Sequence, residues 1–383
     1  RAQLSTWGCR HGSVECDEDK MINEPISDSA GALARLDDLL AADNVAPLKL
    51  DMPALRRLVE RTETVPLFTH SYPFYFHMGT DDGGWGPDDL LGFAAKQDLQ
   101  GVKCHLDAGE SRSFAALSSD KLQALGARAR QLGLRWHVEV SGTDFDRLAG
   151  AVAAATDLDA ESIRCYPRYS GRVSATISRA VEDLRRFRRE LDPASRFRLT
   201  VEQHEDLTSS EMVQIVETLG DSHISLLFDT TNMITSYERP VEALAVQAPW
   251  VTEAHIKDAR ILPDRGGWAQ LCCRTGTGDV PVARLFAELL LLGEHEPQVR
   301  AFGLEEEVNY FAPAYRFPDD PPDPDLPSRG SSKTVALPQI PMPLILADEY
   351  RYAGDQVAWV RDLLTAMHGL AEQALGEAGA GSA

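Results

Sequence analysis

The sequence predicts a (β/α)8 TIM barrel, in which eight parallel strands close into a barrel surrounded by helices. Eight short apolar segments alternate with amphipathic segments between residues 66 and 307, and this alternation favours an α/β barrel over a doubly wound sheet. Four of the apolar segments end in Glu202, Asp229, His255 and Glu305. The carboxyl ends of the strands meet at one face of such a barrel, so these side chains should converge.

Residues 1–65 are predicted to form a partly helical N-terminal extension. They are polar and irregular at first, and helical patterns follow at 29–42 and 52–62. Cys9 and Cys16 lie in this extension with His11 between them, but their spacing fits no common zinc module. The chain has 6 cysteines in 383 residues, too few for a disulfide framework, so a reducing cytoplasm is expected.

The first half of the barrel is predicted to run from residue 66 to residue 191. Its helix at 173–191 has the clearest pattern in the chain, with apolar residues at three- and four-residue spacing and Arg and Glu on the other face. Asp192 and Pro193 end it. The expected strands are 66–72, 102–107, 134–140 and 162–166, and the earlier helices are 119–131 and one that begins at Thr143 or Asp144.

The second half carries the four residues that should converge. Thr208 and Glu211 form a capping box that begins a helix, and Gly220 ends that helix. The expected strands are 197–202, 223–229, 250–258 and 299–307, the other helices are 240–246 and 282–292, and a long loop containing Gly276 and Gly278 precedes the last helix.

Residues 310–343 form a Pro- and Asp-rich insertion after the eighth strand. The segment is too long for a plain connector, so we expect a lid or an interface segment. Its aromatic start should pack over the pocket or against a partner subunit, while 318–332 should be exposed. A closing helix is expected at 347–370, which places the barrel domain at 66–375.

The overall charge and hydropathy exclude some classes of partner. The net charge of −21 disfavours a nucleic-acid-binding protein, which needs a basic surface. No apolar run reaches the roughly 20 residues of a membrane helix, and the first residues lack the apolar core of a signal peptide. We therefore expect a cytoplasmic protein with neither a nucleic-acid nor a membrane partner, and a homo-oligomer is possible.

Strand alternation predicts which side chains face the barrel axis. If Glu202 faces inward, Thr200 does too, while Leu199 and Val201 pack outward against helices. By the same rule, an inward His255 has Glu253 below it and Lys257 above it.

The eighth strand is ambiguous because Glu305, Glu306 and Glu307 are consecutive. We favour Glu305 as the inward residue, since Gly303 and Ala301 would then be the small inward residues beneath it.

Three carboxylates and one imidazole form a hard, oxygen-rich donor set. It suits one divalent metal ion, with Mn²⁺ as the first choice and Mg²⁺ or Co²⁺ as alternatives. A single acidic residue at a strand end is usually a helix cap, but four at corresponding places indicate a site. Cationic and imidazole side chains at other inward positions are candidates for holding a substrate: Lys103, His105, His137, Arg164 or Arg168, His204 and Lys257.

Five motifs, taken in order, resemble those of the xylose isomerase-like TIM barrels, the sugar phosphate isomerase/epimerase superfamily that includes ketose 3-epimerases and hydroxypyruvate isomerases. The resemblance covers about residues 66–310. The motifs are Glu202-Gln-His204-Glu-Asp206, Phe228-Asp229-Thr-Thr-Asn232, Ala254-His255-Ile-Lys257-Asp258, Gly276-Thr-Gly278-Asp-Val and Gly303-Leu-Glu305.

The resemblance implies a role for each residue of the convergent set. Glu202, Asp229, His255 and Glu305 would hold the metal, and Glu202 and Glu305 would also be catalytic, exchanging protons with the substrate carbon. The epimerases often have a histidine three residues after the aspartate, whereas this chain has Asn232, which we expect to contact the substrate instead.

These observations predict a divalent-metal-dependent isomerase or epimerase that acts on a ketose or keto acid through an enediolate. The alternative is a metal-dependent lyase on the same barrel, such as a β-keto sugar acid decarboxylase, a dehydratase or a deglycosidase. A non-catalytic partner subunit is a further alternative, while a DNA-repair endonuclease is disfavoured by the acidic charge. In each enzymatic case the substrate is a small carbohydrate or sugar acid.

Overall fold

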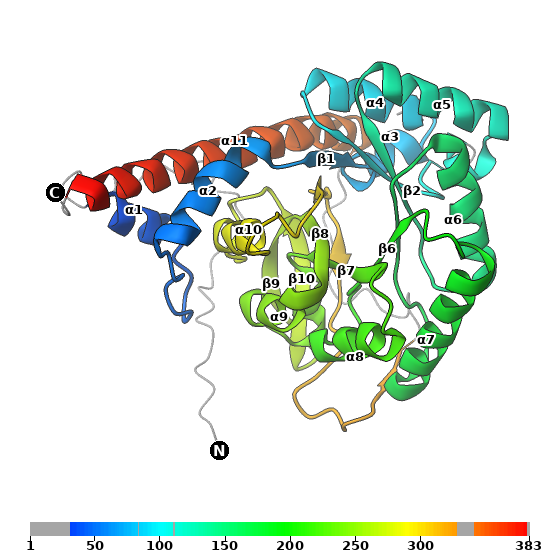
Figure 1. Ribbon diagram of the computed structural model, residues 1–383. Coiled ribbons are helices and arrows are strands. Elements are labelled where there is room, and N and C mark those ends of the chain that lie inside the picture. The colour runs from blue at the N-terminus through cyan, green and yellow to red at the C-terminus, as the bar shows by residue number, and fades with distance from the viewer. Residues whose placement is uncertain (1–30, 83, 110–111, 328–340, 381–383) are drawn as a thin grey trace.

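The fold is known from a computed structural model that describes residues 31–82, 84–109, 112–327 and 341–380. Eight parallel strands close into a barrel in the order β1-β11-β8-β7-β6-β4-β3-β2, with helices around it (Figure 1). The predicted TIM barrel is therefore confirmed. The barrel strands are β1 (Leu67–His70), β2 (Gly101–His105), β3 (Arg135–Glu139), β4 (Ser162–Cys165), β6 (Arg198–Glu202), β7 (Ile224–Asp229), β8 (Val251–Ile256) and β11 (Phe302–Leu304).

The helices follow the predicted order, with two short additions after β1. These additions are α3 (Tyr75–Gly79) and α4 (Pro87–Lys96). The others are α1 (Ala32–Leu39), α2 (Met52–Thr64), α5 (Ser119–Gln131), α6 (Phe145–Leu158), α7 (Val173–Glu190), α8 (Ser209–Leu219), α9 (Pro240–Gln247), α10 (Val282–Leu291) and α11 (Met342–Ala380). Asp144 is the N-cap of α6, accepting a hydrogen bond from the Arg147 amide, and Thr208 and Glu211 form the predicted capping box of α8.

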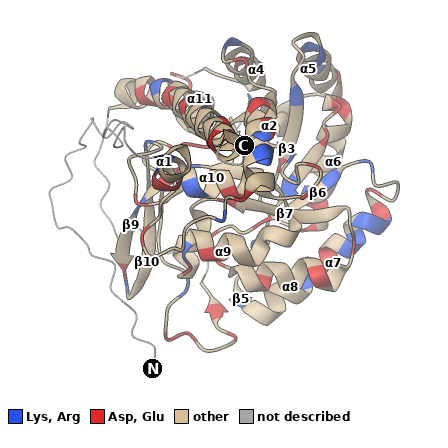
Figure 2. Cartoon of the chain, turned by 60° about the vertical axis from the view of Figure 1, so that its left-hand side comes forward, with Lys and Arg blue, Asp and Glu red and all other residues tan. Residues whose placement is uncertain are grey.

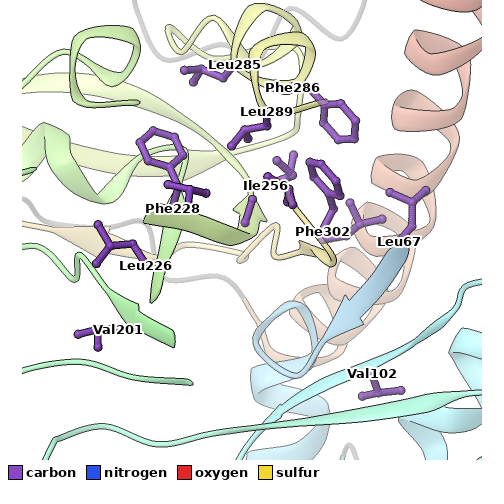
Figure 3. Packing of buried hydrophobic residues seen from close by; sticks show 14 of the residues in the cluster. Leu67, Val102, Val201, Leu226, Phe228, Ile256, Leu285, Phe286, Leu289 and Phe302 are labelled. Atoms are coloured by element: carbon purple, nitrogen blue, oxygen red, sulfur yellow. The ribbon is translucent and has the colours of Figure 1, made fainter. Parts of the chain in front are cut away.

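The outer face of the barrel supplies the apolar core. Figure 3 shows Ile256 and Phe302 directed toward Leu285, Phe286 and Leu289 of α10, and all five are buried. The rings of Phe286 and Phe302 stack with their centroids 4.8 Å apart. Each such side chain contributes about 1.5–3 kcal/mol when it is fully buried. Charged residues instead cover the solvent face of helices such as α7 (Figure 2).

The inside of the barrel is polar, unlike the usual TIM barrel, whose interior is filled by branched apolar side chains. We distinguish two levels and keep these names below. The ligand layer, at the carboxyl ends of the strands, comprises Glu202, Asp229, His255 and Glu305, and the Glu253 layer beneath it comprises Lys103, His137, Ser162 and Glu253. Every member of both layers is at most 2% exposed.

A β-hairpin occupies the place of the predicted long loop after the seventh barrel strand, so the loop prediction is wrong there. Its strands β9 (Asp258–Asp264) and β10 (Gly267–Cys273) pair antiparallel, and β12 (Phe311–Ala312) adds a third strand. Arg265 and Gly266 have φ of 51° and 87°, as a two-residue type I′ turn requires. The Asp-Arg-Gly-Gly sequence was the available signal for this hairpin.

The segment at residues 310–327, here called the strap, leaves the barrel beside β10 and reaches the start of α7. There β13 (Asp325–Leu326) pairs with β5 (Gly171–Arg172). The expectation that residues 318–332 are exposed is wrong for Pro324 and Leu326, which are buried, because β5 and α7 cover them. Residues 328–332 lie outside the described part of the chain.

The final helix is longer than the predicted 347–370 because α1 and α2 pack along it. Gln373 accepts a hydrogen bond from Arg35 at 2.5 Å, and Glu377 accepts one from the Ala32 amide at 3.1 Å. Figure 1 shows α1 against the end of α11 that is remote from the barrel. Cys9, Cys16 and the start of the helix expected at 29–42 lie outside the described residues.

Membrane-spanning helices were sought among the described residues, and none is long and apolar enough to cross a bilayer.

Candidate metal centre

The four residues predicted to converge do so at the carboxyl end of the barrel. Glu202 and Asp229 are the last residues of β6 and β7, His255 is in β8, and Glu305 directly follows β11. One potential ligand atom from each of the four lies within 4.8 Å of the others. Because the strands are adjacent and parallel, residues at corresponding ends are brought together without any special loop.

Each of the four residues presents one buried atom without a hydrogen bond among the described residues. These atoms are Glu202 Oε2, Asp229 Oδ2, His255 Nδ1 and Glu305 Oε2. Buried polar atoms are normally hydrogen-bonded, because leaving one unsatisfied is unfavourable. Three carboxylate oxygens and one imidazole nitrogen, all buried and all close together, fit a divalent cation.

Hydrogen bonds hold the other carboxylate oxygen of Asp229 and of Glu202, and they fix the orientation of both carboxylates. Asp229 Oδ1 accepts from the backbone amides of Thr231 and Asn232 at 2.7 and 2.9 Å. Glu202 Oε1 accepts from Asn232 Nδ2 at 3.0 Å. Asn232 is fully buried, and it contacts two of the four residues, Asp229 through its backbone amide and Glu202 through its side chain.

The charges of the site perturb one another strongly. Burial alone would lower the pKa of His255, but the carboxylates of Glu305, Glu139 and Glu202 outweigh burial and hold that pKa well above its ordinary value. Burial would raise the pKa of Glu202, but the Arg164 guanidinium and His255 bring it down to about 2. Burial raises the pKa of Asp229 despite the nearby Lys257 ammonium. In the metal-free site the pKa of Glu202 is thus lowered, whereas the pKa of Asp229 is raised.

Glu139 at the end of β3 belongs to the site, although the sequence analysis did not single it out. It contacts His70, His255 and Arg164. Glu139 has the same strand parity as the predicted inward residue His137, two positions earlier, so alternation along the strand was the signal that would have found it.

Lys257 lies above the ligand layer. Its Nζ is 3.1 Å from Asp229 Oδ2, 3.5 Å from Glu305 Oε2 and 3.6 Å from Glu307 Oε1. The ring of Tyr310, from the strap, lies 5.5 Å from the same nitrogen, and the Tyr310 hydroxyl is hydrogen-bonded to Glu205. Tyr310, at the start of the strap, therefore lies against this side of the site.

His204 and His105 each lie next to an aromatic ring. His204 stacks on Tyr166 with centroids 4.0 Å apart, and His105 stacks on Tyr72 at 5.6 Å. Burial, with the Arg164 charge adding to it, lowers the pKa of His105 to about 3, so His105 is neutral. Its Nε2 is 2.8 Å from Ser141 Oγ, two residues beyond the end of β3.

Lys103 and His137 were predicted to hold a substrate, but the structure does not bring them to the ligand layer. Lys103 Nζ is hydrogen-bonded to Glu253 Oε2, and His137 Nδ1 lies 3.1 Å from the same oxygen. Both side chains are at most 1% exposed. Their partner Glu253 lies two residues before His255 in β8, one level below it.

Glu306 points away from the ligands. It accepts hydrogen bonds from the amide and hydroxyl of Thr275 at 2.6 and 2.7 Å, and burial raises its pKa to about 8. The inward choice of Glu305 agrees with this geometry. The neighbouring Gly276 and Gly278 amides donate to Asp258 at 2.9 Å each, so this motif anchors a turn at the rim of the barrel.

No family model matches the chain. It is 40% identical over 309 residues to the Escherichia coli protein named "Uncharacterized protein YihM", with 81% of this chain and 94% of that protein covered. It is 27% identical over 165 residues to the 3-oxo-isoapionate decarboxylase of Pectobacterium atrosepticum, with 43% of this chain and 59% of that protein covered.

Solved structures with the same fold are more distant in sequence. A xylose isomerase-like TIM barrel protein from Mycobacterium smegmatis, in complex with magnesium, has a TM-score of 0.52 at 14% identity and covers 81% of this chain and 98% of its own. The D-psicose 3-epimerase of Clostridium cellulolyticum, with D-tagatose, has a TM-score of 0.53 at 14% identity and covers 78% and 99%. Likeness at this identity supports the fold alone.

Proposed function

The chain belongs to the xylose isomerase-like TIM barrels, and from this premise we propose that it is a divalent-metal-dependent isomerase or epimerase of a ketose or keto acid. The observation that carries the proposal is the convergence of four buried potential ligand atoms, three carboxylate oxygens and one imidazole nitrogen, in the ligand layer.

The donor set favours Mn²⁺, with Mg²⁺ or Co²⁺ as alternatives, because hard oxygen ligands dominate it. Glu202, Asp229, His255 and Glu305 would hold the ion. Bound there, the ion would stabilise the negative charge that develops when a carbon next to a carbonyl group loses a proton and an enediolate forms.

The remaining chemistry is assigned to side chains of the ligand layer and its rim. Glu202 and Glu305 come from strands on different sides of the site, so we assign them the removal and return of the proton on the substrate carbon. Lys257 lies close to the ligands, with its Nζ 3.1 Å from Asp229 Oδ2, and it would donate a hydrogen bond to a substrate oxygen. His204, with Tyr310 above, would contact the sugar hydroxyls and exclude water.

A decarboxylase is the second candidate, and one contact favours it. Arg164 Nε lies 2.9 Å from Glu202 Oε2, and it contributes to a Glu202 pKa of about 2, which weakens this carboxylate as a base. A β-keto acid needs no base to begin, because the bond to the carboxylate breaks, CO₂ leaves, and the electron pair stays on the carbon as the enediolate. A named relative at 27% identity is a decarboxylase.

Metal analysis followed by a mass-resolved substrate screen in D₂O tests the proposal. The purified protein should contain one divalent ion per chain, and a ketose or keto acid should be converted without loss of mass apart from incorporated deuterium. Release of CO₂ would replace the isomerase by the decarboxylase. Absence of both metal and turnover, after incubation with Mn²⁺, would leave the non-catalytic subunit as the remaining explanation.

A further inference from the structure

We propose that Glu139 is a positioning residue, which orients the imidazole of His255 and the carboxylates beside it for metal binding. The inference rests on the proposed metal site and adds to it a residue outside the ligand set. Glu139 is fully buried at the end of β3, a strand that supplies none of the four ligands.

The two oxygens of Glu139 contact three donors. Oε1 lies 3.0 Å from His255 Nε2, and Oε2 lies 2.7 Å from His70 Nε2. Arg164 also forms an ion pair with Oε2. One carboxylate therefore holds three cationic or imidazole side chains around the base of the site.

Two of these three donors are connected to the ligand layer. His255 is itself a ligand, and Arg164 Nε lies 2.9 Å from Glu202 Oε2. Glu139 is thus linked directly to one ligand and through Arg164 to a second. Loss of Glu139 would release these side chains together.

The tautomer of His255 follows from this arrangement. Nδ1 faces Glu305 and Glu202, at 3.1 and 3.5 Å, on the side where the open ligand atoms meet. Nε2 faces Glu139, and an ionised carboxylate can only accept a hydrogen bond. When a metal takes Nδ1, the remaining proton must therefore be on Nε2, as in the carboxylate–histidine–metal arrangement that raises the basicity of a ligand.

A second metal bound by His70, Glu139 and His255 is the alternative use of the same atoms, which also lie within 4.8 Å of one another. Two observations oppose it. Arg164 pairs with Glu139, and Lys103 Nζ lies 3.8 Å from Glu139 Oε1, so cations already surround this carboxylate. The Tyr72 amide donates to His70 Nδ1 at 3.1 Å, which assigns the proton of His70 to Nε2 as a donor to Glu139.

Mn²⁺ affinity, measured by titration of the chelator-treated full chain, tests the assignment. Glu139→Gln keeps an acceptor oxygen and should weaken Mn²⁺ binding about 10-fold, and Glu139→Ala should weaken it about 100-fold, the range for partners of metal ligands. Glu349→Gln is the matched control, because Glu349 is an equally buried carboxylate whose Oε2 lies 2.7 Å from the Nδ1 of His77, which is not one of the ligands. It should change the affinity less than threefold.

A measurement on the unaltered protein covers the case in which the Glu139 variants do not fold. In ¹⁵N-histidine spectra of the Zn²⁺-loaded protein, His255 should carry its proton on Nε2 and coordinate through Nδ1. The His255→Gln variant assigns the signal. Coordination through Nε2, or Glu139 variants that bind Mn²⁺ like the unaltered protein, would overturn the assignment.

The Asp229→Asn variant separates this inference from the proposed function. If the unaltered protein binds Mn²⁺ and Asp229→Asn does not, the metal site stands, and the Glu139 variants alone decide the positioning role. If the unaltered protein binds no divalent ion, both proposals fail together.

Discussion

The two levels of the barrel interior contain similar side chains and differ in what their polar atoms contact. In the Glu253 layer, Oε1 of Glu253 accepts from Ser162 at 2.5 Å and Oε2 from Lys103 and His137. In the ligand layer every residue has a buried atom without a hydrogen bond among the described residues, whereas in the Glu253 layer His137 has one, at Nε2. Burying charge without full compensation is unfavourable, so the upper level retains a cost that a bound cation would offset. The difference separates a structural ion cluster from a binding site.

The largest effect should come from removing charge from the ligand layer. Glu305→Gln should weaken Mn²⁺ binding by about 10³-fold, because a lost carboxylate–metal contact removes several kcal/mol and each 1.4 kcal/mol is tenfold. Turnover of any substrate found in the screen should fall with it. Metal content after dialysis is the measurement.

Glu306→Gln is the control for this variant, since Glu306 bonds to Thr275 outside the barrel. It should retain the metal. The reverse pattern, in which Glu306→Gln alone loses the ion, would move the fourth ligand by one residue.

The next effect should come from the Glu253 layer and should appear in stability. Glu253→Gln leaves the buried Lys103 ammonium without its carboxylate, so the free energy of unfolding should fall by about 3 kcal/mol or more. Urea unfolding of the metal-free protein measures it. An unchanged unfolding midpoint would mean that this layer is not the structural cluster described here.

Gly303 lies between the two levels and couples them. A Cβ at this position would be 2.6 Å from Lys103 Cδ and 2.9 Å from His255 Cδ2. Gly303→Ala should therefore lower the free energy of unfolding by about 1–3 kcal/mol and weaken Mn²⁺ binding as well. Gly369→Ala, where a Cβ meets nothing within 4 Å, should do neither, and a Gly303→Ala variant with normal metal affinity would show the levels to be independent.

The smallest expected effect is an increase in the stability of the metal-free protein when Asp229 is replaced by Asn. Burial raises the pKa of Asp229 above its ordinary value of 3.8, so in the metal-free protein its ionisation on raising the pH destabilises the fold. Asp229→Asn should add about 0.5–2 kcal/mol at pH 8 and little at or below pH 3.8, while it abolishes metal binding. Urea unfolding with a chelator at several pH values tests this.

Glu253 should show the opposite pH dependence. Burial would raise its pKa, but Lys103 and His137 hold it well below 4.5, so the stability that Glu253 contributes is present above pH 4.5 and is lost on acidification. The effect of Glu253→Gln should shrink as the pH falls. If the effects of Asp229→Asn and Glu253→Gln on the free energy of unfolding changed with pH in the same direction, the two levels would not differ as described.

Strand-end positions and strand alternation were enough to predict the barrel, the ligand layer and the inward direction of Glu253. They did not predict which polar atoms are satisfied, because this depends on partners from other strands. Lys103 and His137 were predicted as substrate contacts, and the sequence did not indicate that both would contact Glu253, which is more than 110 positions away along the chain. Glu139 was missed for the same reason, since its partners His70, Arg164 and His255 come from three other strands.

The contact between α1 and the far end of α11 bears on the order in which the chain folds during synthesis. The Ala32 amide and Glu377 are 345 residues apart, a stretch that a ribosome translates in roughly 20–70 s. Pairing of β1 with β11, Leu67 with Phe302, also waits for late synthesis, so one edge of β1 stays unpaired until then. The last turns of α11 are therefore synthesised long after α1, the helix that packs against them. Shortening α11 should expose Leu36 of α1 to chaperones and proteases while leaving the metal centre intact.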